Sequence, residues 1–136
     1  MAGSLLIAFG FGWMVVAALL GLYLGAKHQS HIDHLGNAAS AGDLVRYHQE
    51  FESYKWRSSV HAHGMLFALS SVGVGLVLSR KGFESVPAEA LAAMLMVATV
   101  VWTLAALPRI RPLMGLADLL FAGALAWVAV GVSGNL

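Results

Sequence analysis

Residues 58–79, SSVHAHGMLFALSSVGVGLVLS, form an apolar run that carries two histidines, His61 and His63. About 20 apolar residues are enough to cross a bilayer as an α-helix. Ionisable side chains inside a membrane segment are costly, so they usually have partners and mark functional sites. The other four histidines all precede this run: they are His28, His31, His34 and His48. This one-sided histidine cluster is the main indication of function.

The composition favours a membrane protein. The chain of 136 residues is 59% hydrophobic and 11% charged, whereas soluble domains have about 25% charged residues. Lipid can cover this apolar surface, which a soluble core of this size does not bury. The net charge of +1 and the lack of a basic run argue against a nucleic-acid partner. Because the chain has no cysteine, thiolate metal sites, iron–sulfur clusters and covalent haem attachment are excluded.

Four apolar runs predict four transmembrane helices, at about residues 4–26, 58–79, 88–107 and 113–132. The linkers between the last three runs are short, which predicts antiparallel neighbours. We therefore predict an all-α integral membrane protein, with one domain over residues 1–136 and its helices in an antiparallel bundle. Small-residue motifs, Gly21-x-x-x-Gly25 and Ser71-x-x-x-Gly75, predict close helix approach.

The long first linker carries a second helical pattern over residues 43–56, which contain no proline or glycine. Its apolar and aromatic residues recur on one helical face, at Leu44, Tyr47, Phe51 and Tyr54. Asp43 is expected to cap this helix, and Gly36-Asn37 is a plausible end for any continuation of the first helix. We expect a separate amphipathic helix lying at the membrane interface.

The basic residues predict the orientation. The first and third linkers carry six of them, whereas the second carries only Arg80 and Lys81. By the positive-inside rule, both termini are non-cytoplasmic and the histidine-rich linker is cytoplasmic. We expect the protein in a bacterial inner membrane.

His28, His31 and His34 recur at intervals of three residues, so a helix would bring at least the first two onto one face. Imidazole nitrogen suits zinc, copper, iron and nickel, and Asp33 would add a carboxylate. The alternative is a solvated, titratable surface turn.

His61 and His63 point about 200° apart on a regular helix, so only one of them can face a given site. Haem b needs one or two imidazoles from facing helices and an apolar pocket. We expect such a haem between His28 or His31 and His61 or His63. A copper, zinc or iron ion would instead use several of His28, His31, His34, Asp33, His61 and His63. The alternative is a histidine that is hydrogen-bonded to a neighbouring helix.

Asp118 lies about 8 Å below the start of the fourth helix, at a depth similar to that of His63. A carboxylate there needs a partner, which is expected to be His61, His63, Arg109 or Arg111. Its role would be to orient a ligating imidazole or to take up protons. The alternative is an ion pair with Arg111 that holds the third linker in place.

These patterns predict a small polytopic membrane protein that binds haem b or a transition metal, in electron transfer or as a subunit of a membrane redox complex. The alternatives are a cofactor-free accessory subunit and an oligomeric proton or metal transporter. No HExxH, GxSxG or phosphate-loop motif is present, so no catalytic residue is assigned. The expected partners are the lipid bilayer and either other membrane subunits or further copies of this chain.

Overall fold

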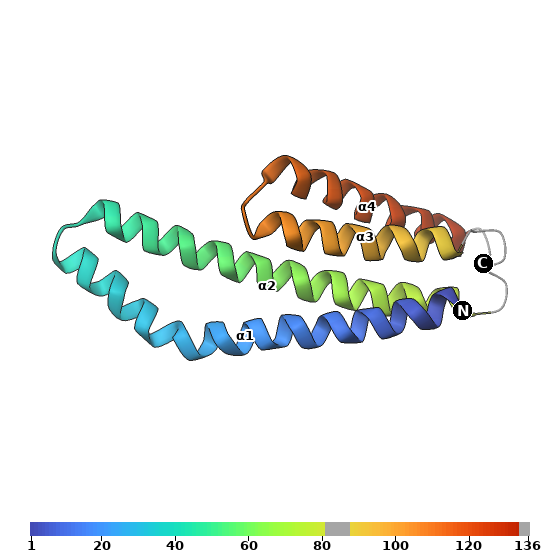
Figure 1. Ribbon diagram of the computed structural model, residues 1–136, viewed down its shortest axis with the longest axis horizontal. Coiled ribbons are helices and arrows are strands. Elements are labelled where there is room, and N and C mark those ends of the chain that lie inside the picture. The colour runs from blue at the N-terminus through green and yellow to red at the C-terminus, as the bar shows by residue number, and fades with distance from the viewer. Residues whose placement is uncertain (81–87, 134–136) are drawn as a thin grey trace.

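The computed structural model describes residues 1–80 and 88–133, and its regular structure there is entirely α-helical. The four helices are α1 (Ala2–Ser40), α2 (Leu44–Leu78), α3 (Ala88–Ala106) and α4 (Arg111–Ser133) (Figure 1). Each is long and apolar enough to cross a membrane, as predicted. Lys81, one of the basic residues of the second linker, lies outside the described residues.

The first two helices extend well beyond the predicted spans. α1 has 39 residues and α2 has 35, so they exceed the bilayer core by roughly 20–30 Å. Residues 44–56 are the first part of α2 rather than a separate helix, and α1 continues through Gly36-Asn37. The helices continue because the segment contains no proline and because each supports the other. Asp43 does cap α2, since its Oδ1 accepts a hydrogen bond from the Arg46 amide at 3.0 Å.

The chain reverses direction between α1 and α2 in a tight turn. Gly42 has a φ of 68°, a left-handed conformation that glycine adopts without steric cost. The Gly42 amide donates to the Ala39 carbonyl and the Asp43 amide to the Ala38 carbonyl, both at 3.0 Å. The result is a long helical hairpin, which projects beyond the turn between α3 and α4 (Figure 1).

The two helices of the hairpin are antiparallel and touch backbone to backbone. Gly3 faces Gly75, and Gly10 faces Ala68, so the residue number falls in α2 as it rises in α1. A Cβ atom at Gly10 would lie 2.8 Å from the Ala68 carbonyl oxygen. Buried α1 residues recur at heptad spacing, as in coiled coils: they include Gly3, Gly10, Ala17 and Leu24.

Of the predicted small-residue motifs, the α2 motif is in this contact, because Ser71 and Gly75 are both buried. The α1 motif is split. Gly21 lies against His61, whereas a Cβ atom at Gly25 would meet nothing within 4 Å.

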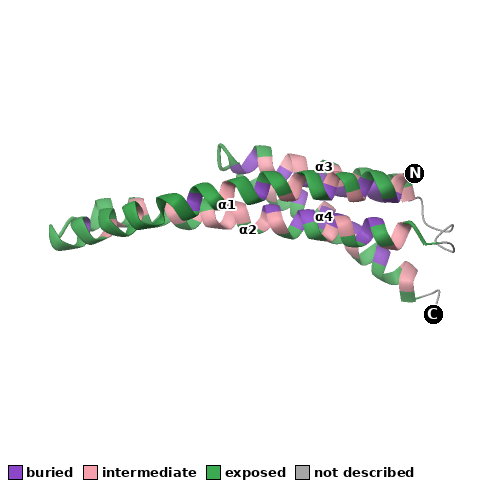
Figure 2. Cartoon of the chain, turned by 90° about the horizontal axis from the view of Figure 1, so that it is seen from below, coloured by how far each residue is buried: buried purple, intermediate pink, exposed green. Residues whose placement is uncertain are grey.

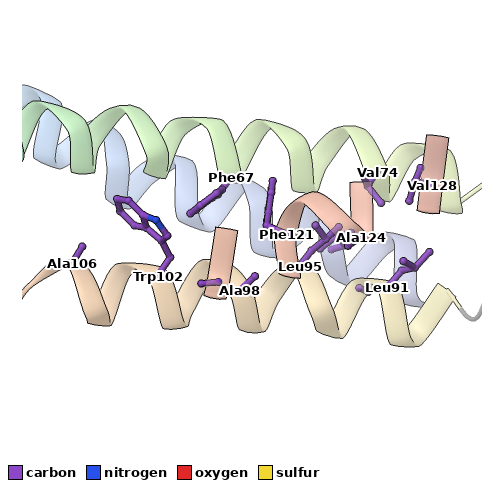
Figure 3. Packing of buried hydrophobic residues seen from close by; sticks show 13 residues of the cluster. Phe67, Val74, Leu91, Leu95, Ala98, Trp102, Ala106, Phe121, Ala124 and Val128 are labelled. Atoms are coloured by element: carbon purple, nitrogen blue, oxygen red, sulfur yellow. The ribbon is translucent and has the colours of Figure 1, made fainter. Parts of the chain in front are cut away.

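Three aromatic rings form the centre of the core between α2, α3 and α4 (Figure 3). The Phe67 and Phe121 ring centroids are 4.4 Å apart, and Trp102 meets Phe67 edge-on at 5.6 Å. Buried residues lie mainly where the four helices run together, whereas the projecting end of the hairpin is largely exposed (Figure 2). Many outward-facing residues beside this core are large and apolar, such as Leu22 and Leu119, which are 71% and 73% exposed.

Candidate functional site: histidines on the helical hairpin

The projecting part of the hairpin brings three histidines of α1 against two residues of α2. His28 Nδ1 is 3.0 Å from the Tyr54 hydroxyl. The His31 ring stacks on the Tyr54 ring, with centroids 4.4 Å apart and planes at 10°. His31 Nδ1 and His34 Nδ1 each lie 4.0 Å from a different oxygen of the Glu50 carboxylate. We call His28, His31, His34, Glu50 and Tyr54 the hairpin cluster.

Within the hairpin cluster, His31 has the side chain with an unused hydrogen-bonding nitrogen that is buried. Its side chain is only 13% exposed, and its Nε2 atom is buried without a hydrogen-bond partner. The separation between Nδ1 and Glu50 is longer than a hydrogen bond. Buried polar groups in native structures are nearly always hydrogen-bonded, so such an imidazole indicates a missing partner, for example a water molecule or an ion.

A hollow of about 310 Å³ opens beside these side chains. Its other lining residues are Tyr23, Lys27, Ser30 and Arg57. Asp33, a predicted ligand, instead accepts a hydrogen bond from Gln29 at 3.0 Å within α1. His48 contacts the edge of the Tyr47 ring. As the described side chains stand, no group of three or more histidines and carboxylates is close enough to hold a metal ion.

His61 lies in the contact between α1 and α2, a full two turns away from His28. Its Nδ1–H donates to the Ala17 carbonyl at 2.9 Å. The ring lies against Gly21, where a Cβ atom would be 2.7 Å from the imidazole Cε1. His61 is therefore the hydrogen-bonded packing histidine that we considered as an alternative.

His63 faces a different part of the bundle, as helix geometry requires. Its Nδ1–H donates to the Ser59 carbonyl at 2.9 Å. Its ring stacks on Trp102 of α3, with centroids 4.5 Å apart and planes at 11°.

The structure does not bring the predicted haem ligands together. His28 faces Tyr54, whereas His61 faces Gly21, seven residues or about 10 Å further along α1. His63 contacts α3. The structure therefore places these candidate ligands against different residues and does not bring them together at one position.

Asp118 lies in a second hollow of about 500 Å³, between α2 and the start of α4. Lys55, Trp56, Ser59, Arg109 and Arg111 also line it. Asp118 is exposed, and within the described part of the chain it forms none of the expected ion pairs with Arg109, Arg111 or a histidine.

Sequence reasoning did not identify Glu50 and Tyr54 as parts of the site. They are spaced i, i+4 and so share one face of α2, but this signal is informative only once the hairpin pairing is known. Comparison with protein-family models, curated proteins and solved structures finds no match to this chain.

Proposed function

We propose that this protein is a membrane-anchored metal-binding protein, with a divalent transition-metal ion held between His31, His34 and Glu50. The observation that carries the proposal is the convergence of two imidazoles on one carboxylate, because His31 Nδ1 and His34 Nδ1 each lie 4.0 Å from a different oxygen of Glu50. Two imidazoles and one carboxylate are a donor set that zinc uses when a fourth position is left to water.

The donors would have to move closer together, because the described side chains do not form a metal-binding group as they stand. Zinc bonds of 2.0–2.2 Å place two donors of a tetrahedral site roughly 3.4 Å apart. The two imidazoles, now 4.0 Å from Glu50, would approach it by about half an ångström. The donors come from two helices that contact each other along the hairpin, so binding would also hold these helices together.

In the membrane, we propose that the four helices form an antiparallel bundle with the hairpin on the cytoplasmic side and both termini on the other. The support is the basic bias of the first and third linkers. The proposed metal would then lie outside the bilayer, where a soluble donor or a larger membrane complex can reach it.

Metal titration of the purified, untagged full-length protein tests the proposal. After chelator treatment, calorimetry with zinc is expected to show one equivalent bound. His31→Ala and Glu50→Gln should each weaken binding at least tenfold, because each removes one of three ligands. His48→Ala is the matched control, since His48 contacts the Tyr47 ring edge, outside the hairpin cluster, and its loss should leave the affinity unchanged.

Two results would contradict the metal proposal. One is the absence of zinc and copper binding, and the other is equal affinity in His31→Ala and in His48→Ala. The visible spectrum of the same sample separates the alternatives. A Soret band would favour haem b, whereas neither metal nor haem would leave a cofactor-free accessory subunit.

A further inference from the structure

The second hollow, between α2 and α4, is separate from the hairpin cluster and shares no residue with it. It lies where α3 ends at Ala106 and α4 begins at Arg111. Trp56 of α2 lines it, and tryptophan is typical of the boundary between hydrocarbon and headgroups. In a bilayer, this end of the bundle would therefore lie at the level of lipid phosphates.

Neither of the two guanidinium groups in this hollow forms an ion pair with a described residue. Arg109 lies over the Trp56 ring, 5.3 Å from its centroid, and Arg111 has no ion pair with a described residue. Glu52 is already paired with Lys55 at 3.6 Å. Asp118 follows Arg111 by seven residues, or about 10 Å along α4, and lines the same hollow without forming an ion pair with a described residue.

Arg109 is held in place rather than free. Its φ of 60° makes it the one described non-glycine residue with a left-handed backbone. The turn is stabilised by hydrogen bonds from the Ile110 amide to the Ala105 carbonyl at 2.9 Å and from Trp56 Nε1 to the Ala106 carbonyl at 3.2 Å. Non-glycine residues kept in this conformation are concentrated at functional sites.

An apolar hollow adjoins this one and shares Trp56 and Arg109 with it. Its lining includes Leu20, Val60 and Leu107. A ligand with an anionic head and an apolar tail would match both the two guanidinium groups and these apolar side chains. Arginine is well suited to phosphate, because its fixed fork of N–H groups can donate two hydrogen bonds to the oxygens.

We propose that this hollow binds the phosphate group of an acidic phospholipid, with Arg109 and Arg111 as its ligands. The acyl chains would lie against Leu20, Val60 and Leu107 of the adjoining hollow. The inference does not depend on the metal proposal.

Native mass spectrometry of the full-length protein in detergent with equal amounts of phosphatidylglycerol and phosphatidylcholine tests it. One phosphatidylglycerol is expected to be retained in preference to phosphatidylcholine. The double variant Arg109→Gln/Arg111→Gln should lower the retained fraction about tenfold. The control, Arg80→Gln, removes a positive charge beyond the opposite end of α2 and should retain the lipid like the unchanged protein.

Three outcomes would overturn the proposal. One is equal lipid retention by the double variant and by Arg80→Gln, and another is retention of phosphatidylcholine as strong as that of phosphatidylglycerol. Displacement of the lipid by millimolar inorganic phosphate would instead assign the hollow to a soluble phosphate. Circular dichroism of each variant checks that its helix content is unchanged, so that a loss of lipid is not a loss of fold.

Discussion

At the scale of single residues, three glycines determine how closely α1 and α2 approach. Gly3, Gly10 and Gly75 each lie so near a backbone carbonyl of the other helix that an added Cβ atom would be 2.7–2.8 Å from its oxygen. Side chains can rotate away from such a clash, but a helix backbone cannot. These glycines therefore set both the separation and the register of the hairpin.

Gly10→Ala should force α1 and α2 apart and lower the free energy of unfolding by about 1–3 kcal/mol, as overpacking does in other cores. Gly12→Ala is the matched control on the same helix, because nothing lies within 4 Å of its added Cβ atom. At position 12, the higher helix propensity of alanine should raise the free energy of unfolding by up to about 1 kcal/mol. Unfolding in sodium dodecyl sulfate, followed by circular dichroism, measures both. Equal changes in the free energy of unfolding for Gly10→Ala and Gly12→Ala would show that the close helix contact does not restrict the residue at position 10.

The His31 side chain allows metal binding to be separated from folding. A buried polar group without a hydrogen bond costs roughly 1–3 kcal/mol. His31→Phe keeps a ring that can stack on Tyr54 and removes the unpaired nitrogen. The metal-free variant should therefore be as stable as the unchanged protein or more so, yet show no increase in melting temperature with zinc. Zinc-dependent stabilisation of His31→Phe would contradict the assigned ligand.

At the scale of elements, the continuity of α1 positions the hairpin cluster. Had α1 ended at the predicted stop, Gly36-Asn37, the segment from residue 43 onward would have been free to lie along the membrane surface. Instead α1 reaches Ser40 and α2 begins at Leu44. The three-residue turn between them keeps His31 and His34 directly opposite Glu50.

Proline at position 36 distinguishes a continuous α1 from a helix that ends there. Within a helix, Gly36→Pro removes a backbone hydrogen bond and clashes with the preceding turn, at a cost of about 3 kcal/mol. Amide hydrogen exchange should then accelerate over residues 28–50 and remain slow over residues 5–20. Gly36→Ala is the control, since the position faces open space. A Gly36→Pro variant with unchanged amide exchange would favour the predicted end of the first helix at Gly36-Asn37.

At the scale of the whole molecule, the hairpin is much longer than the α3–α4 pair beside it. α3 has 19 residues, or about 28 Å, which matches the bilayer core. The excess length of α1 and α2 is all at one end, and it carries four of the six histidines, His28, His31, His34 and His48 (Figure 1). The two ends of the molecule therefore differ in their chemical character.

This asymmetry leads to a test of orientation. The chain has no cysteine, so Ser4→Cys and Ala41→Cys each introduce a single thiol at opposite ends of α1. In intact cells, a membrane-impermeant maleimide should label Cys at position 4 directly and at position 41 only after permeabilisation. The reverse pattern would place the hairpin outside the cytoplasm, and labelling of both positions in intact cells would contradict a spanning α1.

Part of the site was predictable because it depends on local chemistry. His28, His31 and His34 at three-residue spacing indicate a ligand-rich helix face whether or not the partner helix is known. Their partners were not predictable, because Glu50 and Tyr54 come from a segment that was expected to be a separate helix on the membrane surface. The predicted haem pairing of His28 or His31 with His61 or His63 likewise depended on how α1 and α2 are aligned, which no local pattern gives.

The sequence by itself determined that the chain forms four long apolar helices with its histidines on one side, because apolar length, proline positions and composition act locally. Only the tertiary structure decided which side chain each histidine meets. That choice depends on the register of α1 against α2, and the register is set by backbone contacts of Gly3, Gly10 and Gly75. These contacts join residues more than fifty positions apart in the chain, so no local pattern around a histidine contains them.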